Sequence, residues 1–211
     1  MESWFPSLGD SAYTSEPLIV AFHGAGSTES AFSSAGTGRR RVDTLLNGAQ
    51  ERGITIASVQ LPGRGKRSYE PALQSAPGIA QKLVNEALEP LIVQNHHSFN
   101  QFRKYIIVAH SMGSLIAVEA MKHLRKRWKD ERVLPRILIV SCFPAPNTPH
   151  NDLPWNPSGS KLSNNEFQHE LKLWDVNEAV WKSERVWSMY NEMLRNDFMV
   201  CVHCLIEVLY C

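Results

Sequence analysis

A serine between small residues stands directly after an apolar run near the middle of the sequence. The run covers residues 105–109, and His110 leads from it into Ser111, Met112 and Gly113. A serine at a sharp turn between a buried strand and a helix exposes its hydroxyl, and the first N–H groups of the helix point toward whatever binds there. These residue types in this order suit nucleophilic attack on a carbonyl carbon, with Ser111 as the candidate nucleophile.

The residues around Ser111 have the spacing that such a turn requires. Residues 105–109 are mostly apolar and β-prone, which favours a strand buried on both faces. After the serine the apolar residues follow helical spacing, at Leu115, Ile116, Val118, Met121 and Leu124. Strand, turn and helix together form the nucleophile elbow of an α/β-hydrolase, in which Ala109 replaces the first glycine of the usual Gly-x-Ser-x-Gly pattern.

A glycine-containing loop follows another apolar run and could complete an oxyanion hole. Residues 17–22 predict a short buried strand, and the loop His-Gly-Ala-Gly-Ser covers residues 23–27. In an α/β-hydrolase one oxyanion N–H belongs to the residue after the nucleophile, here Met112, and the second comes from such a loop. We assign the oxyanion hole to Met112 and Ala25, with Gly24 as the alternative loop donor. The glycines could equally serve only to permit a tight turn.

The rest of the chain alternates between predicted strands and helices. Residues 54–59 and 136–142 predict two further strands, and residues 39–52 and 76–94 predict helices. This alternation favours the α/β class with a doubly wound, mostly parallel sheet. The loop at residues 60–67 carries positive charge and is expected at the rim of the site.

The last third of the chain changes in character after residue 143. Four prolines predict a long irregular crossing, and residues 163–166 then carry a helix capping box, Ser-Asn-Asn-Glu. The helices that follow are rich in Trp and Tyr, which predicts a lid over an apolar channel at about residues 147–198. Core packing is the alternative explanation of these aromatic residues.

Size and charge exclude several other classes. The chain has 211 residues, 43% of them hydrophobic, and a net charge of +1, which fits one domain and no strong nucleic-acid or membrane interaction. No stretch approaches the roughly 20 apolar residues of a membrane span, so we expect a cytoplasmic protein. We expect one domain over residues 17–198, after an N-terminal extension (1–16) that lies across the surface and before an atypical tail (199–211).

Several segments, in order, resemble the type II thioesterases of polyketide and nonribosomal peptide synthesis, and the related enzymes that release medium-chain fatty acids from fatty acid synthase. The most specific is the string Gln-Leu-Pro-Gly-Arg-Gly at residues 60–65. The other matching segments are residues 18–27, 109–115, 137–146, 162–163 and 194–198. The resemblance implies an α/β-hydrolase fold with a helical lid and a monomer that needs neither cofactor nor metal. It also implies hydrolysis of acyl thioesters on an acyl or peptidyl carrier protein, through Ser111.

The resemblance ends near residue 199. The family completes its catalytic triad with an aspartate in a Gly-x-x-Asp loop and a histidine in a Gly-Gly-His segment, and neither motif follows here. Asp197 and His203 have the right order, but they lie only six residues apart and Asp197 matches a lid position. We therefore assign neither to the triad, and His203 stays open as a substitute base. Weak activity or none is the expectation.

The tail itself is unusual, because Cys201, Cys204 and Cys211 fall within the last eleven residues. Too few ligands surround them for a zinc site. An alternative last exon or a missed splice junction would produce such a tail, and a sheet without its last strands would expose a strand edge and lose stability. Two other functions stay open: a non-catalytic, truncated isoform that binds an acyl chain or a carrier protein, and a carboxylesterase or lipase.

Overall fold

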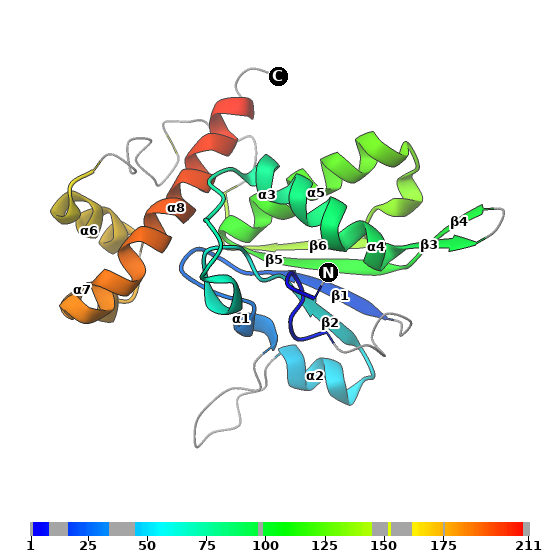
Figure 1. Cartoon of the computed structure of the whole chain (residues 1–211), viewed down its shortest axis with the longest axis horizontal. Helices are drawn as coiled ribbons and strands as arrows, with labels where there is room; N and C mark the ends of the chain where they lie inside the picture. Colours follow the sequence, from blue (N-terminus) through cyan, green and yellow to red (C-terminus); the bar gives the residue numbers. More distant parts are fainter. Residues whose placement is uncertain are drawn as a thin grey trace.

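A four-stranded parallel sheet forms the centre of the fold (Figure 1). The computed structural model describes residues 2–8, 17–33, 45–96, 99–144, 152, 162–174 and 176–208, with side chains described outside 94–100 and 202–208. In spatial order the strands are β2 (Thr55–Ser58), β1 (Leu18–Phe22), β5 (Tyr105–His110) and β6 (Ile137–Ser141). All four strands predicted from the sequence are confirmed. Because they are parallel, their carboxyl ends lie at one edge of the sheet, where binding loops of α/β folds gather.

Helices cover both faces of this sheet. Their bounds are α1 (Ser30–Ser33), α2 (Leu45–Glu51), α3 (Ala76–Leu83), α4 (Glu89–Ile92), α5 (Met112–Trp128), α6 (Asn164–Leu173), α7 (Ala179–Lys182) and α8 (Glu184–Val208). Short 3₁₀ turns cover Gly65–Arg67 and Glu131–Val133. Figure 1 shows α3 to α5 over one face, α2 under the other, and α6 to α8 together at one end of the sheet. None of the described helices is long and apolar enough to cross a membrane.

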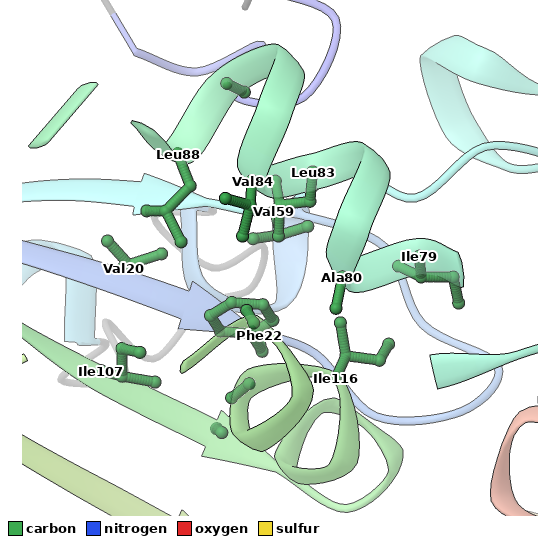
Figure 2. Close-up of a cluster of buried hydrophobic side chains, with 14 of the residues drawn as sticks. Val20, Phe22, Val59, Ile79, Ala80, Leu83, Val84, Leu88, Ile107 and Ile116 are labelled. Carbon is green, nitrogen blue, oxygen red and sulfur yellow. The ribbon is translucent and has the colours of Figure 1, made fainter. Parts of the chain in front are cut away.

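Alternate residues of the strands serve two hydrophobic clusters, as the period of a strand requires. Val20, Phe22 and Ile107 face α3 and α5 in the larger cluster (Figure 2). Ile19 and Ala21 face the opposite way and pack with α2. Both faces of β1 are therefore buried, which explains its continuously apolar sequence.

The helix predicted over residues 76–94 is continuous from residue 76 to residue 92 but changes its pitch before Pro90. A π-helical segment, Val84–Leu88, separates α3 from α4, and the Glu89 N–H donates to the Val84 carbonyl, five residues back. Pro90 has no N–H to donate, and in a regular helix its ring would press against the carbonyl of Glu86. The wider π turn accommodates the proline without ending the helix.

A β-hairpin follows this helix and was not predicted. β3 (Val93–His96) pairs antiparallel with β4 (Phe99–Phe102), with Val93 opposite Phe102 and His96 opposite Phe99. The hairpin projects beyond the sheet (Figure 1). The two strands could not be predicted from the sequence, because Gln and Asn occupy positions in them where apolar residues usually indicate a strand.

The start of the chain packs into the core, so the expectation that residues 1–16 lie across the surface is wrong for Trp4 and Phe5. These two side chains are 0% and 1% exposed. The Trp4 indole donates to Glu86 Oε2 at 2.7 Å, and the Trp4 carbonyl accepts the Gln60 N–H at 2.8 Å. Two adjacent aromatic residues were the available signal. Residues 9–16 lie outside the described residues.

The predicted tail is largely helical. α8 runs through to Val208, and Val200 and Cys201 are buried in the larger cluster at 1% and 2% exposure. Residues 199–208 of the segment expected to be an atypical tail therefore continue the last helix of the lid. The side chains of His203 and Cys204 are not described, and Cys211 lies outside the described residues.

β6 forms the edge of the sheet opposite β2, and among the described residues no further strand covers it. In the described part of the chain β6 pairs only with β5, and Ile137, Ile139 and Val140 are 55%, 47% and 46% exposed. These residues are hydrophobic and β-branched, and they lie on an edge strand that can pair with another strand.

Candidate active site

The backbone at Ser111 is strained in the way that a nucleophile elbow requires. Its φ is 51° and its ψ is −127°, a conformation that residues with a Cβ rarely adopt. The Ser111 N–H donates to the Ser141 carbonyl at 2.8 Å, and the Ser111 carbonyl accepts from the Ser114 N–H at 2.9 Å. The turn is thus held from both sides between β5 and α5, and the serine lies where the strand becomes the helix.

Two glycines allow this turn to pack against the end of β1. A Cβ on Gly113 would lie 2.6 Å from the carbonyl oxygens of both Phe22 and His23. A Cβ on Gly24 would lie 3.1 Å from Ser111 Cβ. At Gly113 a Cβ would overlap backbone atoms, so the close approach of α5 to the end of β1 requires a glycine there, whereas a Cβ at Gly24 would be crowded by Ser111.

Ala109 fits where the usual pattern has a glycine. Its side chain is fully buried, and it stands in register with Phe22 on one side and Val140 on the other. Ala109 belongs, with Ile107, to the hydrophobic cluster on the face that α3 and α5 cover, so its methyl group is accommodated between the strand and these helices.

A cavity of about 430 Å³ opens beside Ser111. The loop of residues 24–27 and His110 line one side of it, together with Ser111. The other side is formed by side chains from α6 to α8, namely Trp174, Val176, Val180, Tyr190, Leu194 and Phe198. The predicted lid helices thus form a largely apolar wall opposite the serine, which suits a ligand with an apolar chain.

The aromatic residues of these helices serve both purposes that the sequence analysis considered. Phe167 is 0% exposed and packs edge to face on Phe198, with ring centroids 5.3 Å apart. The ring centroids of Trp174 and Phe198 lie 4.6 Å apart, and Trp174 also lines the cavity. Core packing and a cavity wall are combined in one small cluster.

The predicted capping box is present, since Ser163 and Glu166 cap the start of α6 reciprocally.

A buried ion pair joins α8 to the loop at residues 60–67. Arg64 and Asp197 are 5% and 1% exposed, and the guanidinium binds the carboxylate through both Nη atoms. Asp197 Oδ2 also accepts the Gly26 N–H at 2.7 Å. The loop at residues 60–67 was expected at the rim of the site, but its Arg64 side chain is buried beneath the loop that borders Ser111. The pairing was missed, although both residues belong to segments that match the thioesterase pattern.

This pairing also shows what Asp197 does in the fold. Its oxygens accept hydrogen bonds from Arg64 and from the Gly26 N–H, and among the described side chains no histidine hydrogen-bonds it. These contacts give Asp197 a structural role between α8 and the loop of residues 24–27.

His23 lies beneath the site as a buried, neutral imidazole. It is 2% exposed, and Nδ1 donates to the Gly24 carbonyl at 2.9 Å. Burial is the main cause that lowers the pKa of His23 from 6.5 to about 4. Nε2 has no hydrogen-bond partner among the described residues.

His110 is the imidazole that shares the cavity with Ser111. It is exposed, and its Nδ1 lies 3.2 Å from Ser141 Oγ. Within the described part of the chain no histidine hydrogen-bonds the Ser111 hydroxyl. Nor do the described residues contain a group of three His, Cys, Asp or Glu side chains that could hold a metal ion.

Comparison with known proteins places this site in a family. A sequence profile of the alpha/beta hydrolase family matches residues 19–201. The chain belongs to this family. It is 31% identical over 149 residues to the gramicidin S biosynthesis protein GrsT of Aneurinibacillus migulanus, covering 70% of this chain and 52% of GrsT. It therefore spans about half the length of the curated relatives that it matches.

Solved structures of type II thioesterases and their relatives share the fold. RedJ, a thioesterase of the prodiginine pathway of Streptomyces coelicolor, superimposes with a TM-score of 0.63 at 27% identity, over 96% of this chain and 72% of RedJ. BorB, the type II thioesterase of the borrelidin cluster, has a TM-score of 0.63 at 21% identity, over 89% and 65% of the two chains. The predicted resemblance to type II thioesterases is confirmed, and the chain is shorter than these structures.

Proposed function

We propose that the chain hydrolyses acyl thioesters and that Ser111 is the nucleophile. The observation that carries this proposal is the strained serine at the edge of a largely apolar cavity. In the reaction Ser111 Oγ bonds to the carbonyl carbon, the carbon–sulfur bond breaks, and the hydroxyl proton passes through water to the departing sulfur, which leaves as the thiol. Water hydrolyses the resulting ester and frees the acid.

The oxyanion of the tetrahedral intermediate would be held by two backbone N–H groups. Met112 begins α5 directly after the serine, and Ala25 lies in the loop of residues 24–27, which lines the cavity next to Ser111. Among the described residues neither N–H has a hydrogen-bond acceptor, so both are free to donate to a ligand. This supports the assignment of Met112 and Ala25 as the oxyanion hole.

The acyl chain would occupy the apolar side of the cavity. Leu194 and Phe198 carry no polar side-chain atoms, and the Trp174 indole N–H already donates to Glu170, so this part of the wall favours an apolar group. The resemblance to type II thioesterases supports a substrate that is tethered to an acyl or peptidyl carrier protein.

Turnover is expected to be slow. A serine hydroxyl needs a base, and within the described residues no imidazole bonds to Ser111. Serine hydrolases that lack triad members retain only about 10³ to 10⁴ over the uncatalysed rate. The same observation favours a second candidate function, in which the chain binds an acyl group or a carrier protein without hydrolysing it.

The test is hydrolysis of a medium-chain acyl thioester, decanoyl N-acetylcysteamine, with RedJ measured alongside for scale. We expect slow hydrolysis that the Ser111→Ala variant loses. Binding of the acyl thioester without any hydrolysis would support the second candidate, and hydrolysis that survives Ser111→Ala would contradict the first. Faster turnover of the matching p-nitrophenyl ester would indicate a carboxylesterase.

A further inference from the structure

One turn of α8 contacts both the cavity and the loop beside Ser111. Leu194 and Phe198 line the cavity, and Asp197, between them in the sequence, binds the Gly26 N–H. The helix lies so close to the loop that a Cβ on Gly26 would stand 3.0 Å from Leu194 Cδ2. This turn of α8 therefore contributes both to the cavity wall and to the position of the loop.

A buried ion pair holds this contact together. Arg64 and Asp197 are both almost fully buried, and an isolated buried charge is costly, so each needs the other in place. Arg64 also donates to the Ser27 carbonyl at 3.4 Å. The pair thus connects three segments: the loop at 60–67, the loop at 24–27 and α8.

We propose that Asp197 and Arg64 are positioning residues for the oxyanion hole. The charged hydrogen bond to the Gly26 N–H fixes the backbone of Gly26, and with it the preceding peptide, including the Ala25 N–H. That N–H is correctly placed only while α8 is docked and Arg64 holds the carboxylate. This inference rests on the proposed function of Ser111.

A boronic acid tests the inference without requiring a catalytic base. Ser111 Oγ adds to the trigonal boron of octylboronic acid, its proton passes to the buffer, and the tetrahedral product carries the negative charge that the oxyanion hole stabilises. Octan-1-ol fills the same apolar wall and forms no such product. The ratio of the two affinities, measured by calorimetry, therefore reports the oxyanion hole separately from the cavity.

Asp197→Asn is expected to lower the affinity for octylboronic acid at least about tenfold and to leave the affinity for octan-1-ol within about twofold. Because Asp197→Asn alone leaves the Arg64 charge buried and unpaired, the double variant Arg64→Gln with Asp197→Asn removes both charges and guards against loss of the fold. The double variant should show the same selective loss. Glu70→Gln is the matched control, because it neutralises the partner of Arg67 in an adjacent ion pair that does not touch residues 24–27.

An unchanged boronic acid affinity in both variants would overturn the inference. So would an equal loss for the two ligands, since that result indicates a purely structural role in shaping the cavity. If Ser111→Ala leaves the octylboronic acid affinity unchanged, the proposed function fails, and the inference that rests on it fails too.

Discussion

At the scale of single residues, the site depends on backbone atoms more than on side-chain chemistry. Ser111 is exposed to the cavity because its backbone is strained, and the strain persists because the surrounding contacts hold the turn. Gly24 and Gly113 permit the approach of the neighbouring segments. The geometry of the elbow therefore depends on a few positions where no side chain fits.

Gly113→Ala tests this dependence. The new methyl group would lie 2.6 Å from two carbonyl oxygens of β1 and the residue after it, which are backbone atoms that cannot turn aside. We expect the free energy of unfolding to fall by about 1–3 kcal/mol, measured by urea denaturation. Gly48→Ala in α2 is the control, because its Cβ would meet only Arg52 Nη1 at 3.6 Å. That variant should be neutral or more stable, and an equal loss in both would contradict the role of close packing.

The buried imidazole of His23 should make the stability of the fold depend on pH. The folded protein holds its pKa near 4, below the ordinary 6.5, so between these values the unfolded chain binds the proton more readily. Its contribution to stability is present above about pH 6.5 and is lost as the pH falls toward about 4. From about pH 8 to about pH 5 the free energy of unfolding should fall by about 2 kcal/mol on this account.

Urea denaturation at the two pH values measures the change, and the His23→Asn variant should show a correspondingly smaller one. The variant keeps an N–H donor for the Gly24 carbonyl but has no group that titrates in this range. An equal pH dependence in both proteins would assign the effect to other groups.

At the scale of elements, the sequence predicted what local patterns encode. Apolar runs marked the four strands, and Ser163 with Glu166 marked the start of α6. The pairing of Arg64 with Asp197 was not predicted, because no local pattern indicates a contact between residues 133 positions apart in the chain. The hairpin of β3 and β4 was missed because its sequence is polar. Contacts distant in sequence are decided by packing, which a single sequence does not display.

The N-terminal segment is the clearest case, because an apparent extension proves to be part of the core. Trp4 lies beneath Arg67, with the guanidinium carbon 4.2 Å from the ring centroid, and is 0% exposed. Trp4→Ala should lower the free energy of unfolding by about 3–5 kcal/mol, as loss of a buried large aromatic side chain does. Tyr69→Ala removes an aromatic side chain that is 81% exposed, and it should change the free energy of unfolding by less than about 0.5 kcal/mol. Similar thermal midpoints for the two variants would mean that the segment contributes no core packing.

At the scale of the whole molecule, the two edges of the sheet differ. At the β2 edge, the segment after the strand is covered, because the Gln60 N–H donates to the Trp4 carbonyl and Val59 is buried. β6 at the opposite edge has an exposed apolar surface, and β5 is its only strand partner in the described part of the chain. A parallel sheet is normally covered on both faces, so this edge is the part of the fold least protected from other chains.

The open edge predicts self-association that a single charge should reduce. Ile139 is 47% exposed in the middle of β6, and a lysine there would place a charge where a second strand or apolar surface would have to pack. Ile139→Lys should therefore lower the fraction of oligomer and aggregate, measured by analytical ultracentrifugation over a range of concentrations. Met189→Lys adds the same charge on α8, at a side chain that is 68% exposed and far from the edge in sequence. If both variants reduced association equally, net charge would explain the effect; if only Ile139→Lys did so, the contact surface is the edge of β6.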